Sequence, residues 1–385
     1  MKFLHISDLH LGTQVYGYSM LEEQKHVLDQ VLACAAERKA DAIVLAGDLY
    51  DRSVPAADAV DLLDTFLTQA PCPVLAVSGN HDSAERVGYG SDIFAKAGIH
   101  MQGKLRKPLY TQDFRDEWGT VRFYFLPFVR PETARMLGCG EKTSDGAVAW
   151  ILQEAREDAA ARKAEDPTFR AVLIAHQYFV TDQTAEAAAN DIAVGGTDLV
   201  RISALDGFDY SALGHIHGRH AVSGNNWYSG SVLPYSFKNA GPHGGLFVEM
   251  KGPGEIMVEP VDFTPMHAWR ILKGPIEELT APENVAAGDP EDYIYAVLTD
   301  DNVTDAHDRL VSVFPNLMGI DFDNARTRAA GAFADGKGPG AELPEMESLD
   351  RLFAEFYEMQ NGSALTESQT ETVRQILEDA KEVQR

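Results

Sequence analysis

Histidine, aspartate and asparagine recur at one kind of place in this 385-residue sequence, directly after short apolar runs. The runs are typical of β-strands, so these polar residues stand at strand ends. Five such ends carry Asp8 and His10; Asp48; Asn80, His81 and Asp82; His176; and His215 and His217. Because sites in open α/β sheets form beyond the carboxyl ends of strands, we expect these side chains to converge.

Oxygen and imidazole ligands without cysteine favour Mn, Fe, Zn or Mg over a thiolate site. Asp8 and Asp48 supply negative charge, and a carboxylate can bridge two cations. Two cations about 3.5 to 4 Å apart can clamp a phosphate, activate a water at neutral pH and stabilise an in-line displacement. The residue types therefore predict phosphoester hydrolysis at a two-metal site. The reaction also needs an acid for the leaving oxygen; His81 is suitably placed, with Asp82 available to orient it.

The elements that must position these residues follow from the apolar pattern. Over the first 250 residues, short apolar runs alternate with amphipathic stretches, which predicts a layered α/β or α+β sandwich. Helices are predicted over 20–38, from Pro55 onward, and over 144–165 as a long exposed helix. The predicted strands are 3–6, 42–46, 74–77, 121–126, 171–175, 210–213, 227–231 and 245–250, the last closing the first unit.

The pattern breaks near residues 261–266, and a smaller unit follows with strands at 268–272 and 293–298 and a helix at 305–314. A glycine-rich stretch then precedes a tail with helical apolar spacing and a capping pattern from Thr366 to Gln369. The predicted divisions are a first domain over 1–262, a second over 263–325, a flexible linker over 326–343 and a helical hairpin over 344–385. The tail could dock a partner or fold back on its own chain.

Composition is that of an ordinary folded protein, with 45% hydrophobic and 24% charged residues. The three cysteines, Cys34, Cys72 and Cys139, are odd in number and widely spaced, which indicates reduced thiols. Asp8 comes too early for the apolar region of a signal peptide, and no run of roughly 18 apolar residues follows. We therefore expect a cytoplasmic protein without a membrane anchor.

Net charge is −26, from 33 basic and 59 acidic residues, which is unfavourable for binding a phosphate backbone. Residues 86–135 differ, with nine basic residues against five acidic ones, a local balance of +4. This excess could form a basic face on an acidic body, or the charges could be scattered over the surface.

The order and spacing of Asp8-x-His10, Gly47-Asp48, Gly79-Asn80-His81-Asp82, His176 and Gly214-His215-x-His217 resemble the signature of calcineurin-like metallophosphoesterases. The resemblance implies that family's two-sheet sandwich, with one metal held by Asp8, His10, Asp48 and His217. It implies a second metal at Asp48, Asn80, His176 and His215, with Asp48 as the bridge. It further implies that His81 is the catalytic histidine and that Mn²⁺ is the expected ion.

Further segments, at 7–12, 47–51, 228–231 and 353–362, resemble the nuclease subunits of bacterial DNA repair complexes within this family. That resemblance implies an exonuclease on double-stranded DNA and an endonuclease on single strands and hairpins, acting in repair and recombination. It also implies a homodimer, a capping domain that touches DNA, and C-terminal helices that bind a coiled-coil ATPase. Asp51 stands where archaeal and eukaryotic relatives carry histidine, and bacterial members resemble this chain there, so it is given no catalytic role.

Two other functions are compatible with parts of the sequence. A small-molecule phosphodiesterase, such as a cyclic-nucleotide hydrolase, could use the same metal site but needs neither the second domain nor the tail. A metal-free scaffold would be expected to lack some ligands, and this sequence has them all.

Overall fold

The computed structural model describes residues 1–181, 198–239, 241–300 and 303–324, together with Thr366, Gln369, Thr370, Thr372 and Val373. Residues Met1–Val297 and Thr304–Asp321 form one compact unit, and the described residues 298–300, 303 and 322–324 belong to a second. Among the residues that the structure describes, none of the helices has both the length and the apolar composition to cross a membrane.

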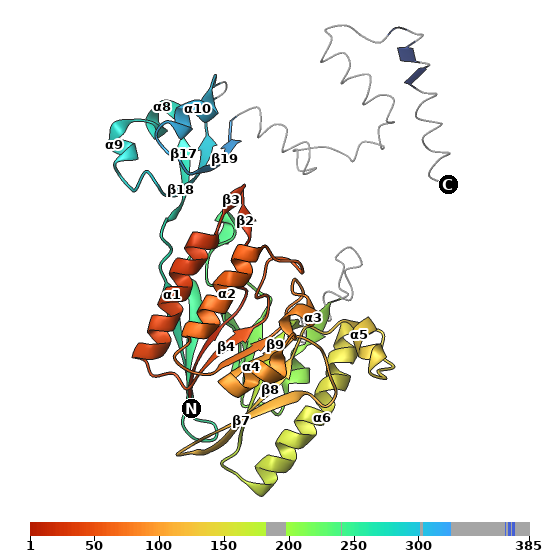
Figure 1. Cartoon of the computed structure of the whole chain (residues 1–385). Coiled ribbons are helices and arrows are strands. Elements are labelled where there is room, and N and C mark those ends of the chain that lie inside the picture. The colour runs from red at the N-terminus through yellow and green to blue at the C-terminus, as the bar shows by residue number, and fades with distance from the viewer. Residues whose placement is uncertain are drawn as a thin grey trace. The chain divides into compact units, whose positions relative to one another are not determined.

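The first sheet of the larger unit has six strands in the order β16-β15-β1-β4-β5-β6. Strands β1, β4, β5 and β6 are parallel, β15 runs antiparallel to β1, and β16 antiparallel to β15. Helices α1 (Leu21–Glu37) and α2 (Ala57–Gln69) cover one face of this sheet (Figure 1). The strands are β1 (Lys2–Ile6), β4 (Ala42–Ala46), β5 (Val74–Val77), β6 (Ile99–Gln102), β15 (His243–Met250) and β16 (Ile256–Phe263).

The second sheet also has six strands, in the order β13-β14-β12-β9-β8-β7. Strands β8, β9, β12 and β14 are parallel, while β7 and β13 are antiparallel edge strands. Helix α6 (Ser144–Glu165) packs on its outer face. The strands are β7 (Tyr110–Asp116), β8 (Gly119–Leu126), β9 (Arg170–His176), β12 (Tyr210–Gly214), β13 (His220–Ser223) and β14 (Asn226–Tyr228).

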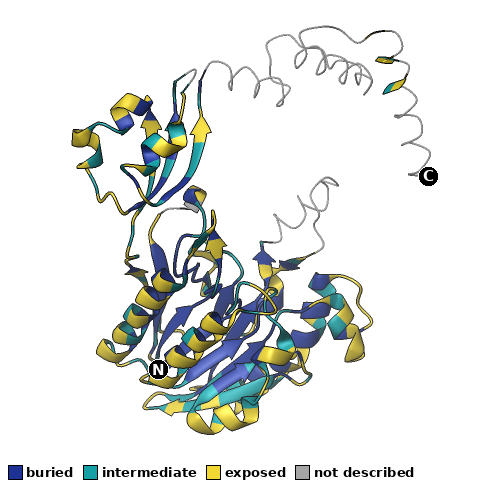
Figure 2. Ribbon diagram, turned by 45° about the horizontal axis from the view of Figure 1, so that its top comes forward, coloured by how far each residue is buried: buried dark blue, intermediate teal, exposed yellow. Residues whose placement is uncertain are grey.

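The two sheets pack face to face, so their central strands are buried on both sides (Figure 2). Phe3 of β1 makes edge-to-face contacts with Phe123 of β8 and Tyr210 of β12, with ring centroids 5.5 Å apart in each pair. Each such pair adds about 0.5 to 1.5 kcal/mol beyond its buried area. Leu4 and Ile6 of β1 point the other way, toward α1 and α2. Burial on both faces explains why these strands are continuous apolar runs in the sequence.

A three-stranded sheet, in the order β17-β18-β19, follows the two large ones. Its strands are β17 (Trp269–Gly274), β18 (Tyr293–Leu298) and β19 (Leu317–Phe322), and its helices are α8 (Ile276–Leu279), α9 (Pro282–Val285) and α10 (Ala306–Val311). Tyr293 and Met318 pack with Phe237 and with residues of the small β2–β3 hairpin (Gln14–Val15 and Tyr18–Ser19). An aromatic cluster thus joins this sheet to the loops of the sandwich.

The predicted strands and helices of the sandwich are present, several with identical bounds, such as 42–46, 74–77 and 144–165. One prediction was wrong: residues 245–250 do not close the unit, because β16 adds an edge strand beside β15. Helix α6 is also not simply exposed, since Val148, Ile151 and Leu152 bury one face. Its buried stripe contains several alanines, so it hardly shows in the sequence.

Most of the predicted linker and tail lies outside the described residues. The capping pattern is confirmed: the Thr366 amide donates to Gln369 Oε1 at 2.9 Å. The predicted domain boundaries stay predictions.

Candidate metal centre

The loops after β1 and β4 continue side by side beyond the sheet. Hydrogen bonds run from the amide of Asp8 to Gly47 O at 3.1 Å and from the amide of His10 to Asp48 O at 3.0 Å. Asp8, His10 and Asp48 have positive φ values of 53°, 43° and 49°, and His215 has 102°. Non-glycine residues rarely adopt such angles, and they persist where surrounding structure fixes them, commonly at functional sites.

A first cluster contains Asp8, His10 and His217. The two Nε2 atoms of His10 and His217 are 3.1 Å apart, and each lies 4.0 Å from Asp8 Oδ1. Asp8 is fully buried and accepts hydrogen bonds from the His215 amide and the Ser7 hydroxyl. These bonds hold the carboxylate in place between the two sheets.

A second cluster contains Asp48, Asn80, His176 and His215. His176 Nε2 is 3.3 Å from Asp48 Oδ2 and 3.1 Å from Asn80 Oδ1. His215 approaches Asn80 Oδ1 with Nδ1, at 3.0 Å. His176 uses its other nitrogen, Nδ1, to donate to Ala46 O at 2.8 Å, which leaves Nε2 facing the cluster.

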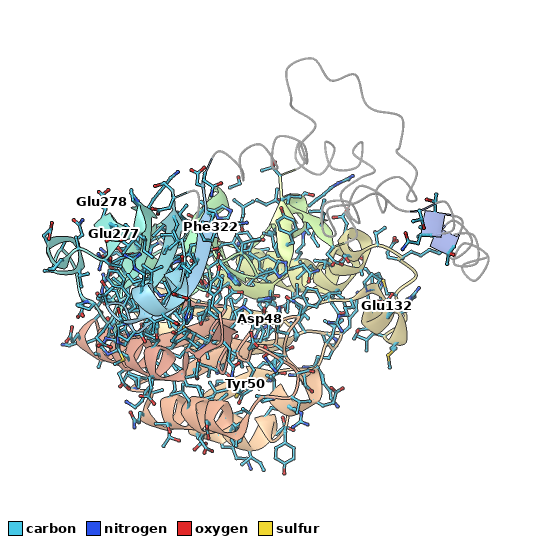
Figure 3. All side chains as sticks on the ribbon, turned by 90° about the horizontal axis from the view of Figure 1, so that it is seen from above. Asp48, Tyr50, Glu132, Glu277, Glu278 and Phe322 are labelled. Carbon is cyan, nitrogen blue, oxygen red and sulfur yellow. The ribbon has the colours of Figure 1, made fainter. Side chains whose placement is uncertain are left out.

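Asp48 belongs to both clusters through a single atom, Oδ2, which is 3.7 Å from His10 Nε2 and 3.3 Å from His176 Nε2. Its other oxygen, Oδ1, accepts a hydrogen bond of 2.9 Å from the His81 amide. The residue before it has to be glycine: Gly47 has φ +89°, and a Cβ there would lie 2.3 Å from His176 Nδ1. Asp48 and Tyr50, which follow β4, are labelled in Figure 3.

The spacings fit shared divalent cations. Ligand atoms about 2.1 Å from one ion lie about 3.0 to 3.4 Å apart at octahedral and tetrahedral angles. Four pairs of facing atoms in the two clusters are 3.0 to 3.3 Å apart. The carboxylate oxygens of Asp8 and Asp48 lie farther from the His10 and His217 nitrogens, at 3.7 to 4.0 Å. Imidazoles, carboxylates and one amide oxygen are a ligand set for Mn, Fe, Zn or Mg.

The electrostatics of the ion-free protein centre on His176 and Asp48. Burial acts to lower the pKa of His176, but the Asp48 carboxylate outweighs it and raises that pKa to about 9. Burial likewise acts to raise the pKa of Asp48, yet His176 and His10 hold it well below its usual range. For His10 and His215, burial dominates and lowers the pKa. A proton on His176 thus occupies a place that a cation would take.

Residues of both clusters line one cavity, among them His10, Asp48 and His215. His81 also lines this cavity and is exposed. Its Nδ1 is 2.8 Å from Asp51 O, and its ring lies edge-on to His10 with centroids 4.8 Å apart. A ring nitrogen of His81 is within 4.8 Å of the ligand atoms of His10 and Asp48. The carbonyl of Asp51 is therefore the group that orients the His81 ring.

Asp82, predicted to orient His81, has backbone partners instead. Its carboxylate accepts from the amides of Leu49, Tyr50 and Gly79 at 2.9 to 3.0 Å. Burial raises its pKa. Asp82 therefore ties the loop after β5 to the loop after β4, and its predicted catalytic role stays a prediction.

The structure brings all seven predicted ligands together and adds residues that sequence reasoning missed. Tyr235 lines the cavity, and its ring lies edge-on to His10 and His217. Phe128 stacks on His215 with centroids 6.3 Å apart. No local sequence signal marks either aromatic residue. Asp51 orients His81 through its backbone oxygen, so the identity of its side chain could not reveal this role.

Residues 1–219 match the family described as calcineurin-like phosphoesterase. The chain is 28% identical over 331 residues to the SbcD subunit of the SbcCD nuclease of Staphylococcus epidermidis, covering 83% of this chain and 85% of that protein. It is 27% identical to the SbcD subunit of Staphylococcus saprophyticus over 98% of both chains. A crystal structure of a dimetal phosphatase from Danio rerio covers 69% of this chain and 99% of its own, with 14% identity and a TM-score of 0.39.

The chain is thus a homologue of these nuclease subunits over nearly its full length. The family match covers both clusters up to His217 and more than half of the sequence. The chain belongs to the calcineurin-like phosphoesterase family.

Proposed function

We propose that the protein is a metal-dependent DNA nuclease: an exonuclease on double strands and an endonuclease on single strands and hairpins. It would act with an SbcC-type ATPase in DNA repair and recombination. One observation carries the proposal: two ligand clusters share Asp48 Oδ2 in a chain whose similarity to nuclease subunits runs over 98% of its length.

The proposed ligands are Asp8, His10, Asp48 and His217 for one ion and Asp48, Asn80, His176 and His215 for the other, with Mn²⁺ as the expected metal. When bound, divalent cations supply Lewis-acid activation of water and neutralise charge on the phosphate. Oδ2 of Asp48 lies near a histidine of each ligand set, so this atom is common to both. The buried positions of Asp8 and His176 exclude bulk water from beneath the reacting groups.

His81 is the proposed acid. With Nδ1–H donated to Asp51 O, Nε2 is the nitrogen that can hold a proton for the leaving oxygen. The His81 amide bonds to Asp48 Oδ1, so the acid and the shared ligand are linked by one hydrogen bond of 2.9 Å. This hydrogen bond supports a fixed position of the His81 side chain relative to the proposed metal ligands.

Support for a nucleic-acid substrate comes from Arg130 and Phe128, which line a second cavity next to the clusters. The charged residues of that lining are two basic ones, Lys104 and Arg130, and two acidic ones, Asp82 and Glu85. Arg130 also donates to Asn80 O at 3.2 Å, so its charge lies beside a proposed ligand. Cations and an aromatic ring suit a nucleic-acid strand. The chain's net charge of −26 leaves the ATPase to supply much of the remaining positive surface.

The proposal includes a homodimer. Exposed apolar side chains occur in two segments, 54–60 and 89–94: Val54, Val60, Tyr89, Ile93 and Phe94 are 41 to 80% exposed. A contiguous patch of such side chains would suit an interface between two copies of the chain. The proposed arrangement also has the 263–325 segment as a DNA-capping domain, the 344–385 helices as the ATPase docking site, and the protein in the cytoplasm.

Turnover on DNA ends and hairpins, compared with cyclic nucleotides under the same Mn²⁺ concentration, tests the proposal. We expect cleavage of DNA, and loss of metal occupancy and cleavage in Asp48→Asn, because one oxygen of Asp48 serves both clusters. A strong preference for the cyclic nucleotide would assign the site to a small-molecule phosphodiesterase. Full activity in Asp48→Asn would remove Asp48 from the site.

A further inference from the structure

Gln24 is a fully buried polar residue on α1 that belongs to neither ligand cluster. Its side chain meets residues 9–12, the segment that leaves β1 and carries His10. Nε2 donates to Leu9 O at 3.0 Å and to His10 O at 2.8 Å, and Oε1 accepts from the Gly12 amide at 3.0 Å. One amide thus serves three backbone groups of a single turn.

The same turn is held on its other side by the loop after β4. The amides of His10 and Leu11 donate to the carbonyls of Asp48 and Leu49, both at 3.0 Å. His10 is therefore fixed from two directions, by backbone on one side and by Gln24 on the other. This matters because His10 has φ +43°, a strained conformation that persists only when its surroundings determine it.

Tyr235 extends this contact to the cavity wall. Its hydroxyl donates to Leu9 O and lies 3.3 Å from Gln24 Nε2. Its ring packs edge-on against His10 and His217, with centroids 5.6 and 6.0 Å away. Gln24 and Tyr235 thereby hold the segment that presents His10 and the ring that borders it.

We propose that Gln24 is a positioning residue that fixes the His10 imidazole for metal binding; this rests on the proposed metal site. The role requires an amide. A glutamate at this position has nearly the same shape and keeps an acceptor for the Gly12 amide, but its carboxylate has no donor for the carbonyls of Leu9 and His10. Two buried carbonyl oxygens would then face negative charge, and the turn would shift away from α1.

Titration of Mn²⁺ into Gln24→Glu without DNA, by calorimetry and electron paramagnetic resonance, tests this role. We expect the ion held through His10 to bind about 10- to 100-fold more weakly, as for residues that support metal ligands. The ion of the other cluster keeps wild-type affinity, which a general loss of structure would not allow.

Gln30→Glu is the matched control. Gln30 lies on the same helix and exchanges two hydrogen bonds with Thr264, its Nε2 to Thr264 O at 2.7 Å and the Thr264 amide to its Oε1 at 3.0 Å. The chemical change is identical, but the contacted segment carries no proposed ligand. We expect wild-type affinity for both ions. Tyr235→Phe, which removes only the hydroxyl, should weaken the same ion as Gln24→Glu by about twofold to tenfold.

Wild-type affinity for both ions in Gln24→Glu would overturn the proposal, as would equal weakening in Gln30→Glu. Should Gln24→Glu not fold, an unchanged Tyr235→Phe would overturn it. If the wild-type protein binds both ions but cleaves no DNA, the proposed function fails while the binding comparison still decides the role of Gln24. If it binds no divalent cation, both fail.

Discussion

Asp48 uses its two carboxylate oxygens differently: Oδ2 faces both ligand clusters, and Oδ1 binds the amide of His81. The side chains of both clusters therefore depend on the orientation of one residue. The protonation of His176 depends on it as well, since the Asp48 carboxylate is what raises the histidine's pKa against the effect of burial. A bound cation would take over from the His176 proton the role of balancing the Asp48 carboxylate.

Metal affinity should therefore rise with pH up to about 9, the pKa of His176 in the ion-free protein. Below that pKa His176 carries a proton that the ion must displace, and above it the competition ends, so higher pH favours binding. We expect release of about one proton per protein near pH 7.5. Calorimetry in buffers of different ionisation enthalpy measures this number. A pH-independent affinity between 7 and 9 would contradict it.

His81→Ala should keep metal affinity and lose activity. Removing a general acid lowers kcat by about 10²- to 10⁴-fold. His220→Ala is a suitable control, because His220 is also exposed and its Nδ1 also contacts a backbone carbonyl, that of Gly218 at 2.8 Å. Single-turnover cleavage and Mn²⁺ titration separate the two effects. An equal fall in metal affinity would make His81 a ligand rather than an acid.

At the scale of elements, α1 holds two segments of the fold through polar side chains. Gln24 contacts the turn after β1, Gln30 contacts Thr264, and Glu23 accepts from the amides of Met266 and His267 at 2.7 and 3.1 Å. His267 Nδ1 is also 2.5 Å from Glu23 Oε1. Polar residues on one helix thus fix both the turn that carries His10 and the segment leading from β16 to β17.

Glu23→Ala should lower the free energy of unfolding by about 2 to 3 kcal/mol, because Glu23 is buried and its loss leaves three donors without their charged acceptor. Glu22→Ala is the control, since Glu22 is exposed on the same turn. Urea unfolding of the metal-free protein measures the difference. Equal stability of the two variants would show that these hydrogen bonds contribute little.

Sequence reasoning singled out the proposed ligands because each stands at the end of a strand buried on both faces, and such strands are unmistakable apolar runs. It could not find Gln24 or Glu23, because polar residues within an amphipathic helix look like any solvated position. It missed β6 and β7 because each has exposed or half-buried positions that interrupt the apolar pattern. Asp82 was predicted to contact the His81 side chain, because a sequence does not reveal which backbone amides a carboxylate will bind.

At the scale of the whole molecule, the proposed nuclease would combine a catalytic sandwich with a tail that binds its partner. Every proposed ligand lies before residue 218, well before the tail begins. Catalysis on simple substrates and assembly with the ATPase should therefore be separable.

Deleting the residues after Pro339 should leave Mn²⁺-dependent cleavage of simple DNA substrates and abolish co-purification with the ATPase. The deletion removes residues 344–385, whose apolar helical spacing is the proposed docking site for the ATPase. Both ligand clusters lie outside the deleted residues. Metal stoichiometry of the shortened protein serves as the control. Undiminished co-purification would place the docking surface elsewhere.

Each cluster takes residues from both sheets: His10 and Asp48 follow strands of the first, whereas His176 ends one strand of the second and His217 follows another. If these residues hold a divalent cation, residues of both sheets would bind the same ion. Separation of the sheets would then require release of that ion. An ion present at about a thousand times its dissociation constant then adds about 4 kcal/mol against opening. The supply of the metal would then affect the protein's stability as well as its catalysis.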